Sequence, residues 1–183
     1  LIDYRAVKGT FDSIVSVGMF EHVGKRHYPE FFEQTRRLLS DDGVMLLHTI
    51  GRMGGPGKTD AFTDRYIFPG GYNPALSEIV AASEPHRMIM SDCETLRVHY
   101  AHTIHHWYDR CVAAKDKLVE MYDERFYRMW IFYLAGAETV FRHGGMCNYQ
   151  LQYVRDRRAL PLSRDYMAAA ETIYLAADGL APV

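Results

Sequence analysis

A glutamate and a histidine stand where two predicted strands end, and together they form a candidate catalytic site. Glu21 lies in the stretch SVGMFEHVG, directly after the apolar run FDSIVSV at 11–17. His48 lies near the end of a second apolar run, VMLLHTI at 44–50. In an open α/β sheet, ligands bind outside the carboxyl ends of the strands. The topology therefore predicts that both side chains reach the same edge of the sheet.

Each of these residues also has a purely structural interpretation. A glutamate after a strand is commonly a surface carboxylate, and a histidine inside an apolar strand is commonly a satisfied core side chain. Two features favour a site at Glu21: Val17 and Phe20 make its setting apolar, and glycines on both flanks permit close approach to a ligand. A carboxylate in such a setting needs a hydrogen-bond donor, or desolvation raises its pKa. For His48, both interpretations stay open.

A strand–helix–strand unit positions the pair. Between the two apolar runs, the segment 29–39 (PEFFEQTRRLL) repeats apolar residues at helical spacing. Pro29 suits the first turn of this helix, and Gly43 suits the exit before the second strand. A βαβ unit makes the two strands parallel neighbours. The sequence therefore predicts an α/β fold with a doubly wound sheet.

The remaining elements follow from periodicity and turn residues. A glycine-rich loop is expected at 51–64, a helix opening at Asn73-Pro74, and a short strand at 88–90. Two long helices are expected at about 96–122 and 124–142. Polar and apolar residues alternate over 146–154, which predicts a late antiparallel strand. Ser163 is expected to cap an Ala-rich helix that ends near Gly179.

Other chemistry-bearing groups favour structural roles. Three of the histidines at 99, 102, 105 and 106 share a helical face, but no further metal ligand with a supporting shell is identifiable, so no metal site is predicted. The run GGPGKT at 54–59 lacks the first glycine of a phosphate-binding loop. Aromatic residues make up 13% of the chain, and the two long helices carry many of them. Most should be core, while a few could line a tunnel for an apolar substrate.

Composition excludes several classes of function. A formal net charge of −2 gives no basic field for nucleic acid. Three cysteines, Cys93, Cys111 and Cys147, are far apart and favour reduced thiols in a cytoplasmic compartment. The most apolar segment, 126–141, is interrupted by Arg128 and Glu138, so no membrane-spanning helix is predicted.

Several spaced motifs, in order, resemble the cyclopropane-fatty-acyl-phospholipid synthase family, close relatives of the mycolic acid cyclopropane synthases. They are DYRAVKGTFDSIVSVGMFEHVGKRHYPEFF, GVMLLHTIGR, RYIFPGGYNPALSEI, SEPH and HYAHTIHHWYDR. The resemblance covers about residues 1–154. It implies a class I S-adenosylmethionine-dependent methyltransferase fold of the Rossmann-like type. It also implies transfer of a methyl group to the cis double bond of an unsaturated phospholipid acyl chain, followed by ring closure.

The resemblance further implies which residues hold the small molecules. A bicarbonate ion, acting as general base, would be bound by Glu21, His48, Tyr100 and the backbone of Ile50. S-adenosylmethionine would be bound by the segment Asp3, Tyr4 and Arg5 near the adenine, and by the backbone of Val17 and Gly18. Two anions side by side repel, so we infer that the bicarbonate hydroxyl donates to Glu21, while His48 and Tyr100 donate to its oxygens. Glu21 would then orient the base rather than act on the substrate.

One departure from the family concerns the cofactor loop. The family's glycine-rich loop should lie upstream of Asp3, and it is absent here, so the chain is expected to be an N-terminally truncated, C-terminal fragment. We expect 1–160 to be the C-terminal portion of a methyltransferase domain, with a helical, substrate-covering insertion at about 52–142. Residues 161–183 are expected to form a helical tail. A sheet lacking its first strands should expose an edge and apolar surface, with marginal stability.

The resemblance also bears on location and partners. It implies a cytoplasmic protein associated peripherally with the inner face of the membrane, where its partners are unsaturated phospholipid acyl chains. It leaves a homodimer open. Two alternative functions stay open as well: methyl transfer to another acyl or small-molecule substrate without ring closure, and an inactive lipid- or partner-binding fragment.

Overall fold

A four-stranded mixed sheet forms the centre of the molecule. The computed structural model describes residues 1–179. The strands are β1 (Phe11–Val17), β2 (Leu39–Arg52), β3 (Ile89–Leu96) and β4 (Met146–Val154), in the order β1-β2-β4-β3. β1 and β2 are parallel, as the βαβ unit predicts, and β4 is antiparallel to both of its neighbours. The predicted α/β class and the late antiparallel strand are confirmed.

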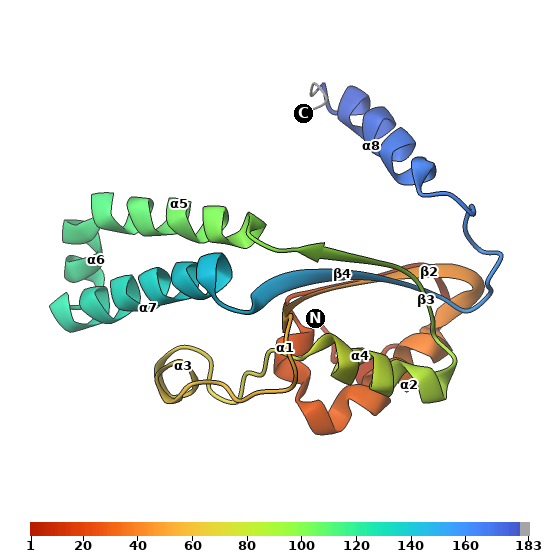
Figure 1. Cartoon of the computed structure of the whole chain (residues 1–183), viewed down its shortest axis with the longest axis horizontal. Coiled ribbons are helices and arrows are strands. Elements are labelled where there is room, and N and C mark those ends of the chain that lie inside the picture. The colour runs from red at the N-terminus through yellow and green to blue at the C-terminus, as the bar shows by residue number, and fades with distance from the viewer. Residues whose placement is uncertain (180–183) are drawn as a thin grey trace.

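The helices form three groups around this sheet (Figure 1). On one face lie α1 (Phe20–Val23), α2 (Tyr28–Leu38) and α4 (Leu76–Ser83), with the short turns η1 (Tyr4–Ala6), η2 (Lys25–His27) and η3 (Glu84–His86). Beyond the ends of β3 and β4, α5 (His99–Ala113), α6 (Lys115–Met121) and α7 (Glu124–His143) make a helical hairpin, with α3 (Ala61–Tyr66) in a loop nearby. On the other side of the sheet from α2 and α4 lies α8 (Asp165–Ala177).

Alternation along β2 explains where the main core lies. Met45 and Leu47 are fully buried, whereas the alternate residues Val44, Leu46 and His48 are only half-buried. Successive side chains of a strand point to opposite faces, so the odd-numbered residues face α2 and α4. There they pack with Leu151, Tyr153 and Phe32. The Phe32 ring lies edge-on to the Tyr153 ring, with ring centroids 5.4 Å apart. A smaller second cluster lies between α5 and α7.

Several element boundaries differ from the sequence-based predictions. β2 begins at Leu39 rather than Val44, because Leu39 pairs with Phe11 of β1. The predicted short strand at 88–90 extends to Leu96, because its residues pair with β4. The polar sequence SDCET hid this extension, since β3 lies at the sheet edge and most of its side chains are not buried. The segment 52–142, predicted as a helical insertion, therefore contains a strand of the sheet.

Three helix predictions also need correction. The helix expected at 96–122 begins at His99 and breaks at Ala114, where the backbone leaves helical geometry and α6 turns back toward α7. Part of the predicted loop at 51–64 is helical, because Asp60 caps α3 by accepting from two backbone amides. Ser163 does not cap α8; Arg164 occupies that position, and Ser163 donates to Asp165 instead. Residues 180–183 of the predicted tail lie outside the described residues.

β1 forms an edge of the sheet with apolar side chains in solvent. Phe11, Val15 and Val17 are 42%, 67% and 63% exposed. All three lie on the face opposite α2, since the alternate residues Ile14 and Ser16 are less exposed. The expected exposed edge and apolar surface are confirmed; the expected marginal stability stays a prediction. No helix among the described residues is long and apolar enough to cross a bilayer.

Candidate active site

Just beyond the end of β1, the carboxylate of Glu21 accepts the next hydrogen bond that the β2 backbone donates. The last ladder bond of β1 runs from the Gly18 amide to the His48 carbonyl at 3.1 Å. Gly18 then adopts a positive φ of 62°, which suits glycine, and the chain turns into α1. The next amide of β2 on this side, that of Ile50, donates to Oε1 of Glu21 at 2.6 Å. The strand end therefore fixes the carboxylate at the rim of the sheet, as predicted.

The second oxygen of Glu21 is a buried acceptor without a donor. The residue is 6% exposed, and Oε2 has no hydrogen-bond partner among the described residues. Leaving a buried polar atom unpaired costs about 1–3 kcal/mol, and more for a charged group. At the rim of the sheet, such an acceptor is available to a bound molecule that completes its hydrogen bonding. The surface interpretation of Glu21 is therefore wrong.

Tyr100 lies in the first turn of α5 and faces the same region. Burial and, second, the negative charge of Glu21 raise the pKa of its phenol. The phenol therefore stays protonated at neutral pH and can donate a hydrogen bond. Burial and the nearby Tyr100 raise the pKa of Tyr133, on α7, to about 12. The side chain of Ile50 packs in the same cluster as both tyrosines. Glu21, Ile50 and Tyr100 thus come together, although they are far apart in the chain.

His48 is held by two carboxamides of β4. Its Nε2 lies 3.3 Å from Nδ2 of Asn148, and its Nδ1 lies 3.2 Å from Nε2 of Gln150. A neutral imidazole has one donor and one acceptor, so one of the two carboxamides must present its oxygen to the ring. Asn148 has a buried Oδ1 without a partner, which makes it the natural acceptor. The structure therefore brings the His48 carbonyl, but not its imidazole, into hydrogen bonding at the end of β1.

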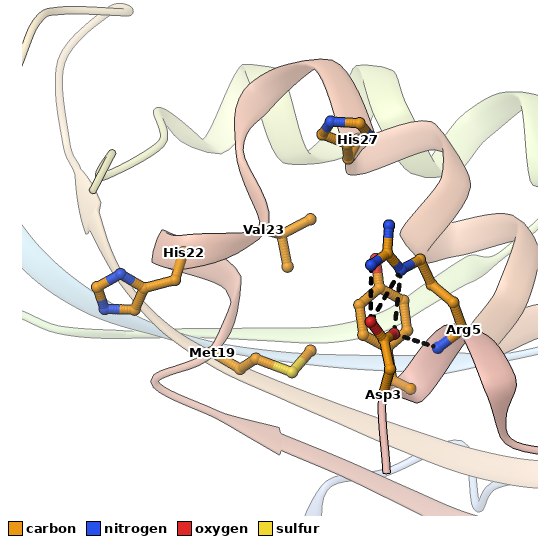
Figure 2. A pocket seen from close by; sticks show the side chains of 7 residues that line it. Asp3, Arg5, Met19, His22, Val23 and His27 are labelled. Atoms are coloured by element: carbon orange, nitrogen blue, oxygen red, sulfur yellow. Dashed lines mark hydrogen bonds and ion pairs between the residues drawn. The ribbon is translucent and has the colours of Figure 1, made fainter. Parts of the chain in front are cut away.

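A separate pocket lies beside the chain start. It has a volume of about 320 Å³ and is lined by Asp3, Tyr4, Arg5, Met19, His22, Val23 and His27. Asp3 and Arg5 face one another and form an ion pair at 2.7 Å (Figure 2). Hydrogen bonds from the side chain and then the backbone of Arg5 lower the pKa of Asp3 to about 2. Asp3, Tyr4 and Arg5, the three residues predicted near the adenine, therefore line one cavity, and the carboxylate of Asp3 is ionised at neutral pH.

The two other predicted cofactor residues do not line this pocket. Val17 is 63% exposed on the open face of the sheet. Gly18 forms the turn that leads to Met19, which does line the cavity. Both residues therefore lie next to the pocket along the chain.

Several residues of these sites were missed from the sequence. Met19, His22 and Val23 are neighbours of Glu21, so their position beside a predicted site residue was an available signal. The sequence carried no signal for His27, because the turn η2, which was not predicted, places it at the pocket. Asn148 and Gln150 belong to the alternating pattern of β4, but only the pairing of His48 with Gln150 shows that they reach the imidazole.

The histidines of α5 have other partners. His105 lies 3.1 Å from Glu138 of α7 and 3.6 Å from Asp109. Glu138 also pairs with Arg142 at 2.7 Å. Within residues 1–179, no group of three or more His, Cys, Asp or Glu side chains is arranged to hold a metal ion.

Comparison with known proteins identifies the family. A model described as mycolic acid cyclopropane synthetase matches residues 1–151. Cyclopropane-fatty-acyl-phospholipid synthase of Escherichia coli K12 is 39% identical over 155 residues, which are 85% of this chain and 40% of that protein. The tuberculostearic acid methyltransferase UfaA1 of Mycobacterium tuberculosis is 37% identical over 162 residues, or 85% of this chain and 38% of that protein.

A solved structure agrees with this assignment. Mycolic acid cyclopropane synthase CmaA1, complexed with SAH and CTAB, is 30% identical and superimposes with a TM-score of 0.75. The superposition covers 82% of this chain and 57% of CmaA1. The chain thus has the α/β fold of S-adenosylmethionine-dependent methyltransferases, and it spans about two fifths of the length of the two curated relatives described above. It belongs to the mycolic acid cyclopropane synthetase family.

Proposed function

We propose that this chain carries part of the active site of an enzyme that methylates the cis double bond of an unsaturated phospholipid acyl chain. S-adenosylmethionine would be the methyl donor, and loss of a proton would close a cyclopropane ring. The family membership supports methyl transfer to a lipid. The observation that carries the proposal is the free, buried Oε2 of Glu21, which lies in the same region as the Tyr100 phenol.

The pocket at Asp3, Tyr4 and Arg5 supports binding of the methyl donor. Its volume of about 320 Å³ suits part of a nucleoside rather than an acyl chain. Asp3 is ionised at neutral pH, so it can accept hydrogen bonds from hydroxyl or amino groups. Met19 and Val23 add apolar contact surface to the lining. This pocket and Glu21 are joined by the short segment that follows β1, which would place the donor close to the carboxylate.

The side chains present also fit bicarbonate as the base. Oε2 of Glu21 is an acceptor that suits a hydroxyl, and the Tyr100 phenol is a donor that suits an anionic oxygen. Two anions repel unless a proton lies between them, so the hydroxyl would face Glu21. When bound, bicarbonate would supply a base near the transferred methyl group. The Ile50 amide already donates to Glu21, so we assign it to holding the carboxylate rather than the ion. His48 would need to release one carboxamide to contribute.

The residues of the chain meet the demands of the reaction. An alkene is a weak nucleophile, so the reacting atoms must be held in line at close distance. Attack of the π bond on the sulfonium methyl would form a C–C bond and break the S–CH3 bond, so that S-adenosylhomocysteine would leave and a carbocation would remain on the acyl chain. Tyr100 and Tyr133 offer aromatic faces, and Glu21 offers negative charge, all of which stabilise a cation. Water would convert the cation to an alcohol, so the reaction also needs a water-poor setting, and the partly buried, apolar surroundings of Tyr100 and Tyr133 favour one.

Replacement of Glu21 tests this assignment. Glu21→Gln keeps an oxygen for the Ile50 amide but replaces the free acceptor by a donor. In the full-length protein carrying this sequence, we expect turnover to fall by about 10²-fold or more, with cofactor affinity nearly unchanged. Glu33→Gln, on the exposed side of α2, is the matched control and should leave both unchanged. Equal losses of turnover and cofactor affinity in Glu21→Gln would refute the role of Glu21.

A second candidate function is methyl transfer without ring closure. The similarity to UfaA1, which is named a tuberculostearic acid methyltransferase, supports this second candidate. Mass spectrometry of lipids from cells that express the protein separates the two. Gain of one methylene with loss of the double bond supports ring closure, and a methylated product without a ring supports the alternative. Absence of cofactor binding by calorimetry in the full-length protein would instead support a binding role.

A further inference from the structure

A second cavity lies between α3 and the start of α7, away from the Glu21 site. Its volume is about 600 Å³, and it is lined by Phe62, Glu124, Arg125, Arg128, Met129 and Phe132. Arg125, Arg128, Met129 and Phe132 are spaced by three or four residues, so they share one face of α7. Phe132 is 64% exposed although it is a large apolar residue. This groove thus combines apolar walls with two guanidinium groups at its mouth.

The mouth of the groove carries positive charge without an internal counterion. Within residues 1–179, neither Arg125 nor Arg128 has an ion pair or a side-chain hydrogen bond. Glu124 is the acidic residue of the lining, and its Oε1 lies 3.7 Å from Nζ of Lys115. The charge of Glu124 is therefore partly balanced by a lysine of α6. The two arginines remain available for an anion from outside the chain.

Aromatic contacts lead from this groove toward Glu21. Phe62 of α3 packs edge-on against Phe132 of α7, with ring centroids 5.1 Å apart. One residue further along α7, Tyr133 packs against Phe68 at 6.1 Å. Tyr133 and Tyr100 both pack against the buried cluster between α5 and α7. Burial and, second, the charge of Glu21 raise the pKa of Tyr100, which agrees with its place near the carboxylate. Phe132 and Tyr133 are consecutive residues of α7, so one aromatic pair lies at the groove and the next lies toward the proposed site.

We propose that this groove is the entrance for a membrane phospholipid, with Arg125 and Arg128 holding its phosphate and the acyl chain running along α7 toward Tyr133. This inference rests on the proposed function and adds the site of head-group binding. Guanidinium groups bind phosphate oxygens in a bidentate geometry. Apolar side chains beside them match the acyl region of the same molecule, which a free phosphate ion would not require. The apolar lining beside the two arginines therefore favours a phospholipid over inorganic phosphate.

The dimensions of α7 agree with this arrangement. At a rise of 1.5 Å per residue, Tyr133 lies about 8–12 Å along the helix axis from the two arginines. This is less than the half-thickness of a bilayer hydrocarbon core, which is about 15 Å. A phosphate at the arginines thus allows the middle of an acyl chain to reach Tyr133 and Tyr100. Tyr66, Met121 and Tyr122 are also 46–60% exposed near this end of the hairpin and would contact the membrane interface.

Vesicle binding by the full chain tests the proposal. The probe is vesicles of phosphatidylglycerol and phosphatidylcholine, and the variant is Arg125→Glu/Arg128→Glu. We expect its vesicle affinity to fall by roughly tenfold or more, because each cationic residue near an anionic surface contributes several-fold. The matched control is Arg110→Glu/Lys117→Glu, which changes the same charge on the exposed surface of α5 and α6 outside the groove. Its loss should be at least threefold smaller. Equal losses, or vesicle binding by neither variant nor parent chain, would overturn the proposal.

Two further measurements separate the sources of phosphate and the proposed function. NMR signals of the Arg125 and Arg128 side chains should shift with monomeric short-chain phosphatidylglycerol and not with equal inorganic phosphate. Equal shifts, or binding only to an acidic carrier protein, would contradict the assignment. Arg125→Gln/Arg128→Gln should show the same loss of vesicle affinity, with a circular dichroism spectrum equal to that of the parent chain.

Turnover separates this inference from the proposed function. In the full-length protein, Arg125→Glu/Arg128→Glu should lower turnover on phospholipid but not on a free unsaturated fatty acid. Absence of methyl transfer to either substrate by the parent protein refutes the proposed function alone.

Discussion

The helix-covered side of the sheet and the α5–α7 hairpin differ in how completely they bury their large apolar side chains. Between the sheet and α2, side chains such as Phe32, Leu47 and Tyr153 have no exposed surface. In the hairpin, the cluster between α5 and α7 has four buried residues, namely Ala101, Ile104, Leu134 and Phe141. Large aromatic residues of the hairpin such as Phe132 and Tyr122 remain in solvent. One region is built as a rigid scaffold, and the other leaves apolar surface available for a partner.

The candidate site lies where these two regions meet. Glu21 belongs to the scaffold, because the β2 backbone holds its carboxylate. Tyr100 belongs to the hairpin, and Ile50 connects the two through its amide and its side chain. A fixed carboxylate on one side and a helix pair with exposed apolar side chains on the other suit the proposed reaction, which must position a long apolar substrate against a defined polar group.

The largest expected difference between the regions is in stability. Phe32→Ala removes a fully buried ring that contacts Phe20, Phe31 and Tyr153, and we expect a loss of about 3–5 kcal/mol. Phe132→Ala makes the same change on the exposed side of the hairpin, and we expect a loss of less than about 1 kcal/mol. Urea denaturation of the two variants measures both. Similar losses would show that the hairpin is packed as tightly as the scaffold.

A buried carboxylate gives a smaller, pH-dependent difference. Glu78 accepts from the Tyr72 hydroxyl at 2.7 Å and the Ala75 amide at 2.9 Å, and pairs with Lys25 at 2.6 Å. We expect Glu78→Ala to cost about 1–3 kcal/mol at pH 7. Glu120→Ala, on the exposed surface of α6, should stay within about 0.5 kcal/mol of the parent.

The direction of the pKa shifts fixes the pH range of this effect. Burial opposes ionisation of Glu78, but the contacts with Lys25, Tyr72 and Ala75 together lower its pKa below 4.5. Its stabilisation is therefore complete above pH 4.5 and is lost as the pH falls through the lower folded-state value. The contact with Glu78 raises the pKa of Lys25 above 10.5, so the share of Lys25 is lost only as the pH rises through that higher value. Acid unfolding of the parent and Glu78→Ala should converge at low pH; a constant gap would contradict this.

Much of the scaffold was predictable because local patterns and tertiary contacts agree there. The apolar run at 11–17, the helical stripe after Pro29 and the alternation at 146–154 all became the expected elements. Prediction failed where pairing or chain reversal decides the outcome. β3 is polar yet paired, and Ala114 interrupts a helical pattern that continues through it. Neither feature leaves a mark in local composition.

The site was predictable in part for the same reason. A carboxylate directly after a strand must lie at the sheet rim, so the place of Glu21 followed from topology. The sharing of a region by Glu21 and Tyr100 followed from the family resemblance, since their separation in the chain hides it. The imidazole of His48 was harder to place, because the carboxamides of Asn148 and Gln150 on β4 determine its contacts. Neighbours on a distant strand cannot be read from the histidine itself.

The smallest expected effect tests the central claim most directly, namely that Glu21 and Tyr100 face one region across the junction of scaffold and hairpin. NMR titration of tyrosine ring carbons should give Tyr100 a pKa above 10.0 in the parent chain. In Glu21→Gln, this pKa should fall because one negative charge is gone, yet stay above 10.0 because burial is the larger cause. Tyr149, whose raised pKa has burial and Cys147 as its main causes, should titrate unchanged. An unchanged pKa of Tyr100 in Glu21→Gln would contradict the claim.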